Sequence, residues 1–235
     1  MTVFSNRRAL IIGGSGAIGS VIAHGLAQRG ASVTVHGAHS LERLNSVIES
    51  IRRSGGHAQS LLCPLDSPDM IEKVLDTEHP DIFVCAWGPF RRGALETMTV
   101  NDWQYLVYAN LMVPGMFISA LLPSMIEKKW GRLLLFGGTN TDTIRAFKTT
   151  ALYSSAKTAL GTLAKSVALV HADICCNVLC PGLTDTFSSD CTYNHAHNPG
   201  GKILSPQMIA TVALNILENP QINGAIIPVD YGLKL

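Results

Sequence analysis

The chain of 235 residues is poor in charge and has no excess of either sign. Charged residues make up 15% of it and hydrophobic residues 47%, a balance that excludes disorder and provides for a large buried core. Eighteen Lys and Arg stand against seventeen Asp and Glu, which gives a formal net charge of +1. Because nucleic-acid binding normally needs a basic excess, we expect no nucleic-acid partner.

The six cysteines include no CxxC pair, so the common zinc and dithiol motifs are missing. The adjacent pair Cys175 and Cys176 also fits no disulfide framework. His195 and His197 lie close together, but no third ligand stands near them at zinc spacing. We therefore expect reduced thiols in a cytoplasmic protein, and no bound metal.

Long uninterrupted hydrophobic runs are missing as well. The run 9–12 is short and ends at two glycines, which argues against a signal peptide. The stretch from Trp103 to Ile126 carries no Lys, Arg, Asp or Glu and has the length of a membrane span. Polar and helix-breaking residues such as Asn110 and Pro114 interrupt it. This pattern favours a buried or interface helix, and we expect no membrane contact.

What the chain does contain is an alternation of short apolar runs with helix-length segments. The runs expected to form strands are 8–12, 32–36, 59–62, 82–86, 132–136, 175–179 and 225–229. Right-handed crossovers between such strands predict an α/β fold, doubly wound, with a mostly parallel seven-stranded sheet and helices on both faces. Since no linker or repeat divides the chain, we expect one domain over residues 1–235, with a substrate lid near 187–203.

A glycine-rich turn directly follows the first expected strand. It reads Gly13-Gly14-Ser15-Gly16-Ala17-Ile18-Gly19 and opens a helix expected from about Ser20 to Arg29. Glycines allow a tight turn and the close approach of a pyrophosphate, and the helix amino terminus offers free N–H groups. An ordinary glycine turn is the alternative, but this context predicts a dinucleotide site. The expected contacts are Gly13, Ser15, Gly16, Ile18 and Gly19.

The loop after the second expected strand contains no acidic residue. It reads His36-Gly37-Ala38-His39-Ser40, whereas a carboxylate there would bind the adenine ribose and repel a 2′-phosphate. His39 and Ser40 can donate hydrogen bonds to phosphate oxygens. The loop favours NADP, and NAD stays the alternative because no Lys or Arg lies in it. The candidate contacts are His36, Ala38, His39 and Ser40.

A tyrosine and a lysine four residues apart, Tyr153 and Lys157, lie near the start of a helix expected to reach about His171. Residues at this spacing share one helical face, so the ammonium can lie near the phenol and lower its pKa. Such a phenol is a usable general acid or base near neutral pH. An exposed lysine beside a half-buried tyrosine is the alternative interpretation.

Three further motifs follow in order: Asn110 in Asn-Leu-Met-Val-Pro-Gly, Pro181-Gly182 after the sixth strand, and Val229-Asp230-Tyr231-Gly232. With them, the whole chain resembles the classical short-chain dehydrogenase/reductase family. The resemblance implies a Rossmann-type domain, hydride transfer between NAD(P) and a carbonyl or hydroxyl group of a small-molecule substrate, and a homo-oligomer, dimer or tetramer, assembled through the uncharged stretch and the Tyr153 helix. It also implies that Tyr153 exchanges the proton, that Lys157 holds the nicotinamide ribose, and that Asn110 supports a proton relay.

The sequence departs from the family pattern at the active-site serine. Residues 136–140 read Phe-Gly-Gly-Thr-Asn, so the serine position falls on Gly138, and the loop to Tyr153 is about two residues longer than usual. The residues able to supply the missing polar group are Thr139, Asn140 and Thr141. We favour Thr139, because a turn with positive φ at Gly137 and Gly138 would aim it at the phenol. If none serves, the chain is a catalytically impaired dinucleotide-binding regulatory protein; a scaffold protein is a third possibility.

Other cofactor contacts are assigned by the resemblance through their place in the chain. They are Leu65, Asp66, Cys85, Ala86, Trp87, Pro181, Gly182, Thr184 and Thr186. The family's Asn-Asn-Ala-Gly turn reads Cys85-Ala86-Trp87-Gly88 here, and Trp87 belongs either under the adenosine ribose or in the core. Asp66 competes with Pro64 for the position near adenine. Arg91, Arg92, Arg145 and Lys148 leave an acidic substrate open, but the substrate itself is not named by the sequence.

Overall fold

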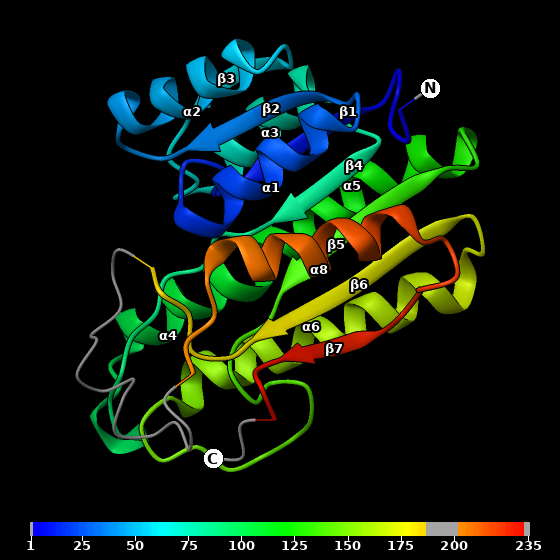
Figure 1. Cartoon of the computed structure of the whole chain (residues 1–235). Helices are drawn as coiled ribbons and strands as arrows, with labels where there is room; N and C mark the ends of the chain where they lie inside the picture. The colour runs from blue at the N-terminus through cyan, green and yellow to red at the C-terminus, as the bar shows by residue number, and fades with distance from the viewer. Residues whose placement is uncertain (1, 187–201, 233–235) are drawn as a thin grey trace.

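A computed structural model of the chain describes residues 2–186 and 202–232. Its centre is a seven-stranded parallel sheet in the order β3-β2-β1-β4-β5-β6-β7, which confirms the predicted doubly wound α/β fold (Figure 1). The strands are β1 (Arg8–Ile12), β2 (Ser32–Gly37), β3 (His57–Leu62), β4 (Ile82–Cys85), β5 (Gly131–Phe136), β6 (Ile174–Pro181) and β7 (Ile226–Val229). The ends of every strand lie within two residues of the predicted bounds.

Helices cover both faces of the sheet (Figure 1). One face carries α1 (Ala17–Gln28), α2 (Leu41–Arg53) and α8 (Pro206–Glu218). The other carries α3 (Pro68–Thr77), α5 (Val113–Glu127) and α6 (Ala151–Val170). A short 3-10 helix, η1 (Leu95–Thr97), α4 (Val100–Val107) and a π-helical turn, η2 (Tyr108–Met112), lead into α5.

The apolar runs of the strands are explained by burial on both faces. In β1, Ile11 belongs to the core under α1 and α8, while its neighbours Leu10 and Ile12 belong to the core under α5. Successive side chains of a strand point to opposite faces, so a sheet covered on both sides needs a continuous apolar run. Each fully buried Leu or Ile contributes about 1.5–3 kcal/mol.

The strand order reverses between β1 and β4, and this reversal determines where a ligand can bind. Ile12 pairs with Cys85, and Cys85 with Leu135, so β1, β4 and β5 end side by side. In open α/β sheets, ligands bind in the crevice outside the carboxyl ends of the strands at such a switch point. The segments that begin at Gly13, Ala86 and Gly137 therefore meet at one edge.

The uncharged stretch of the sequence forms α4, η2 and α5. Within the described residues, Val100–Glu127 is long and apolar enough to cross a membrane by length and composition, with a mean hydropathy of 1.6. Its residues Val113, Phe117 and Leu121 are buried against the sheet. This packing is that of the buried or interface helix predicted from the sequence.

The predicted lid near 187–203 falls almost entirely outside the described residues, as do His195, His197 and Cys191. Where the description resumes, Leu204 forms an isolated bridge with Thr184. The remaining cysteines are free thiols, namely Cys63, Cys85, Cys175, Cys176 and Cys180.

Candidate functional site

The glycine-rich turn forms a cradle between β1 and α1. Gly13 has a φ of +77°, and a Cβ there would lie 2.9 Å from the backbone nitrogen of Trp87. A Cβ on Gly19 would lie 2.3 Å from the carbonyl oxygen of Gly13. The N-cap residue Gly16 supplies no side-chain cap, and the first turn of α1 holds no acidic residue. The uncapped N–H groups and the positive end of the helix dipole therefore fit a pyrophosphate.

Ser15 of the glycine turn lies at the end of β2, beside the loop 37–40 that is expected to distinguish NADP from NAD. The Ser15 hydroxyl lies 2.9 Å from the position that a Cβ would take on Gly37. Ser40 caps α2 by accepting a hydrogen bond from the backbone N–H of Arg43 at 3.3 Å, and His39 is exposed. Sequence reasoning overlooked Arg43, which brings a cation into the first turn of α2. The sequence held a signal for this, because Arg43 follows Ser40, a good helix N-cap, by three residues.

His36 has a different place from the one predicted for it. Its ring is 1% exposed, Nδ1 accepts a hydrogen bond from the N–H of Gly13 at 3.2 Å, and Nε2 donates to the carbonyl of Cys63 at 2.7 Å. Burial lowers the pKa of His36, with the hydrogen bond to Cys63 acting in the opposite direction. Since both nitrogens bind backbone, His36 ties the glycine turn to the end of β3 and presents no free group to a cofactor.

The other predicted cofactor positions lie along the same edge of the sheet. Leu65 and Cys85 are buried, Asp66 is exposed, and Trp87 is half-buried against the core cluster under α5. Beyond β6, the hydroxyl of Thr184 donates to the carbonyl of Gly182 at 3.0 Å. The remaining cofactor positions assigned by the resemblance also lie within the described residues; they are Ala86, Pro181 and Thr186.

Asn110 and Lys157 are brought together at Gly88. A Cβ on Gly88 would lie 2.3 Å from Oδ1 of Asn110 and 2.7 Å from Nζ of Lys157, so only glycine leaves room for the two groups. Nζ also donates to the carbonyl of Phe136 at 2.8 Å. The Asn110 amide nitrogen donates to two backbone carbonyls, while its Oδ1 is buried with no partner. Sequence reasoning did not single out Gly88.

Tyr153 is held between two loops. On one side, a Cβ on Gly138 would lie 2.9 Å from Cε1 and 3.0 Å from the phenolic oxygen of Tyr153. On the other side, the ring of Phe90 meets the Tyr153 ring edge to face, with centroids 5.0 Å apart. The phenol of Tyr153 thus packs against Gly138, which is the residue at the family's serine position.

The predicted lowering of the Tyr153 pKa by Lys157 is not seen in this structure, where burial of the phenol dominates. Burial raises the pKa of Tyr153, and the neighbouring Cys180 acts in the same direction. Burial also lowers the pKa of Lys157 to about 8. Lys157 Nζ lies 6.0 Å from the ring centroid of Tyr153, so the loss of hydration outweighs the attraction between ammonium and phenolate.

The prediction that a turn with positive φ at Gly137 and Gly138 aims Thr139 at the phenol is wrong. Neither Gly137 nor Gly138 has a positive φ; the left-handed residue is Asn140, with a φ of 59°. The Thr139 hydroxyl donates instead to the carbonyl of Pro181 at 3.3 Å. The structure therefore does not bring this hydroxyl onto Tyr153.

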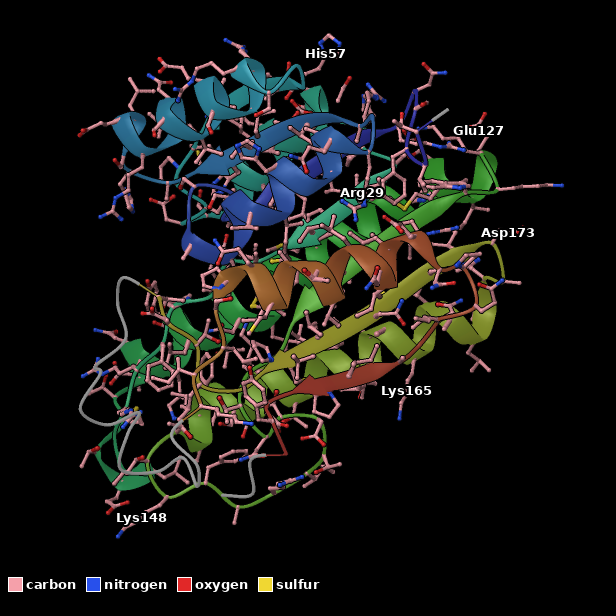
Figure 2. The ribbon with its side chains drawn as sticks, in the orientation of Figure 1. Arg29, His57, Glu127, Lys148, Lys165 and Asp173 are labelled. Carbon is pink, nitrogen blue, oxygen red and sulfur yellow. The ribbon has the colours of Figure 1, made fainter. Side chains whose placement is uncertain are left out.

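The basic residues of the two neighbouring loops are largely engaged within the protein. Arg91 pairs with Asp102, and Arg145 lies 3.7 Å from the Asp142 carboxylate. Lys148 points away from the body of the molecule (Figure 2). Across residues 2–186 and 202–232, no three His, Cys, Asp or Glu side chains are placed to hold a metal ion.

Comparison with known proteins identifies one family to which the chain is similar. The family model described as short chain dehydrogenase matches residues 7–195. Versicolorin reductase of Emericella nidulans is 29% identical over 210 residues, which cover 86% of this chain and 77% of the relative. D-beta-hydroxybutyrate dehydrogenase of Rhizobium meliloti is 28% identical over 184 residues, 75% of this chain and 70% of the relative.

A solved structure is similar over nearly the whole chain. The 3-oxoacyl (acyl-carrier-protein) reductase from Agrobacterium tumefaciens C58, solved with NADP bound, has a TM-score of 0.88 and 29% identity. The similarity covers 97% of this chain and 95% of that one. The chain therefore belongs to the short chain dehydrogenase family of oxidoreductases, as the resemblance implied.

Proposed function

We propose that this enzyme uses NADP(H) to interconvert a ketone and a secondary alcohol on a small-molecule substrate. The observation that carries the proposal is the juxtaposition at the carboxyl ends of β4 and β5. There, Gly88 is flanked by Asn110 and Lys157, and Gly138 lies against the phenol of Tyr153. The uncapped amino terminus of α1 provides a pyrophosphate site at the same edge.

The bound cofactor supplies or accepts the hydride at the nicotinamide, and the side chains of this chain handle the proton. In the reductive direction, Tyr153 gives its phenolic proton to the oxygen that gains charge as the carbonyl is reduced. Lys157 stabilises the phenolate that is left, and its ammonium also suits the nicotinamide ribose hydroxyls. The unpartnered Oδ1 of Asn110 can hold a water beside this ammonium and so connect the phenol to solvent.

The substrate class is proposed from the relatives' names. A 3-oxoacyl-[acyl-carrier-protein] reductase and a D-beta-hydroxybutyrate dehydrogenase among the relatives suggest a carbonyl or hydroxyl group at the 3-position of an acyl chain. The test is the oxidation of NADPH, followed by absorbance, with a panel of 3-oxoacyl thioesters, 3-oxo esters and aromatic ketones. Turnover of one class supports the proposal. Tight binding of NADPH without turnover of any ketone in the panel supports the second candidate, a catalytically impaired regulatory protein. The missing hydroxyl at Gly138 is the observation that favours this candidate.

NADPH is expected to bind more tightly than NADH, and Ala38→Asp is expected to reverse the preference by at least about tenfold. The loop 37–40 after β2 contains no carboxylate, and it carries the exposed His39 and lies beside the Ser15 hydroxyl. The first turn of α2 holds Glu42 and Arg43, whose charges offset each other. A carboxylate at position 38 would repel the 2′-phosphate and bind the ribose hydroxyls. Calorimetric titration of parent and variant with both cofactors measures this. Equal or tighter binding of NADH by the parent contradicts it.

The enzyme is expected to be a dimer or tetramer at micromolar concentration. Within the uncharged stretch through which we expect assembly, Leu106 and Phe117 are buried inside the chain itself. Others remain exposed on α4 and at the end of α6, namely Val100, Trp103, Tyr105, Leu169 and Val170. Apolar side chains that gather on one exposed helix, as Val100, Trp103 and Tyr105 do on α4, are typical of an interface. Multi-angle light scattering that finds only a 25.2 kDa species contradicts this expectation.

A further inference from the structure

A tight turn directly after β5 carries the residues that could replace the missing serine. The N–H of Thr141 donates to the carbonyl of Gly138 at 3.2 Å and closes the turn 138–141. Asn140 occupies its third position with a φ of 59°. Asparagine tolerates this left-handed conformation better than other residues with a side chain. The turn therefore projects the Asn140 side chain in a direction that a normal backbone would not allow.

The hydroxyl groups on either side of Asn140 are already used within the protein. The Thr139 hydroxyl donates to the carbonyl of Pro181. The Thr141 hydroxyl donates to the carbonyl of Gly138 at 3.0 Å and accepts from the N–H of the same residue at 2.8 Å. A hydroxyl has a single proton to donate. Neither threonine thus has a donor left for a substrate.

The amide of Asn140, by contrast, has an unused donor. The residue is 4% exposed, its Oδ1 accepts from Nη1 of Arg145 at 3.3 Å, and its Nδ2 is buried with no partner. Because a guanidinium only donates, the contact with Arg145 determines which end of the amide is the nitrogen. An unpaired buried N–H is costly, so this nitrogen is suited to an acceptor that arrives with a ligand.

We propose that Asn140 is a catalytic residue whose Nδ2 donates a hydrogen bond to the substrate carbonyl oxygen, in place of the absent serine hydroxyl. The proposal rests on the proposed function. As the hydride of NADPH bonds to the carbonyl carbon, the π electrons move to the oxygen, which then takes the proton of Tyr153 to give the alcohol. The amide stabilises the charge on the oxygen before that proton arrives. Gly138, two residues earlier in the turn, already touches the phenol.

Two variants of Asn140 test the proposal. Asn140→Gly keeps the left-handed backbone and removes the amide, and Asn140→Asp keeps the shape and the partner Arg145 but has no donor when ionised. Both are expected to lose about a hundredfold in kcat on a ketone that the parent reduces, with the Kd for NADPH within about twofold of the parent. Ile144→Ser, at a position in the same loop that is 93% exposed, is the control and should match the parent.

The pH dependence separates catalysis from structure. A protonated carboxyl donates a hydrogen bond again, so the ratio of kcat for Asn140→Asp to that for Asn140→Gly should rise as the pH falls toward about 4. A merely structural role would give no such rise. The proposal is overturned if Asn140→Gly retains kcat within about threefold of the parent, or if Thr139→Val loses more than Asn140→Gly does.

Failure of the proposed function would be seen separately, as a parent enzyme that binds NADPH and reduces no ketone. The proposal about Asn140 is then decided by a crystal structure of the NADP⁺ complex. One oxygen can bridge Nδ2 of Asn140 and the phenolic oxygen of Tyr153 only if the two atoms lie within about 6 Å of each other. A separation within that limit supports the proposal, and a larger one overturns it.

Discussion

Replacing Tyr153 by phenylalanine is expected to lower kcat about a hundredfold or more and to leave the affinity for NADPH nearly unchanged. The change removes one hydroxyl and keeps the ring, so the edge-to-face contact with Phe90 and the packing on Gly138 are retained. What is lost is the hydroxyl that we propose as the proton donor. The ring is expected to stay in place, because its contact with Phe90 and its contact at Cε1 beside Gly138 do not need the hydroxyl.

The measurement is steady-state reduction of the best ketone from the panel, together with calorimetric titration of NADPH. Tyr105→Phe, which removes the hydroxyl of an exposed tyrosine on α4, is the matched control and should behave as the parent. Near-parent turnover by Tyr153→Phe would reject this residue as the acid or base. A loss of NADPH affinity equal to the loss of kcat would place the defect in binding instead.

Lys157→Met is expected to abolish activity and to stabilise the protein without cofactor. The ammonium is buried, and burial lowers its pKa from 10.5 to about 8. Between these values the unfolded chain binds more protons at this site than the folded one, so the free energy of unfolding of the parent rises from pH 8 to pH 10.5. Below pH 8 the folded state bears the whole cost, about 3 kcal/mol. A methionine of similar length has no charge to bury and removes this cost.

Urea denaturation at pH 7 and pH 10 measures the effect. The gain from Lys157→Met should be present at pH 7 and smaller at pH 10, where much of the parent lysine is neutral in the folded state. Lys165→Met, in the same helix and exposed, controls for changes in helix propensity and in overall charge (Figure 2). If Lys157→Met unfolds more readily than the parent at pH 7, the hydrogen bond from Nζ to Phe136 outweighs the cost of burial.

The fold was predictable because burial on both faces forces the central strands, such as β1, β4 and β5, to be apolar along their length. Leu10, Ile11 and Ile12 show why, since each packs into a core on one face or the other. The start of α1 was placed three residues late, because the helix begins inside the glycine motif at Ala17. Residue types and spacing thus determine the elements but leave their ends uncertain by a turn.

The details of the site could not be predicted in the same way, because they depend on contacts between distant segments. His36 was assigned to the cofactor from its place at the end of a strand, yet both of its ring nitrogens form hydrogen bonds within the protein, to the backbone of Gly13 and Cys63. Because β2 is buried from Val33 to Gly37, no alternation along the strand distinguished His36 from its neighbours. No sequence pattern revealed that Asn140, rather than a glycine, would adopt the left-handed conformation in the turn after β5.

The central position of β1 has a consequence for the order in which the protein assembles. This strand is first along the chain, but its pairing with β4 joins residues about seventy positions apart, such as Ile12 and Cys85. Such non-local parallel pairing is slow, since the entropy of closing a long loop is lost before any contact forms. The glycine turn rests on Trp87, which follows β4, so the dinucleotide cradle is completed only after that closure. We therefore expect NADPH to bind late in refolding, so that its fluorescence would report the moment at which β1 and β4 have paired.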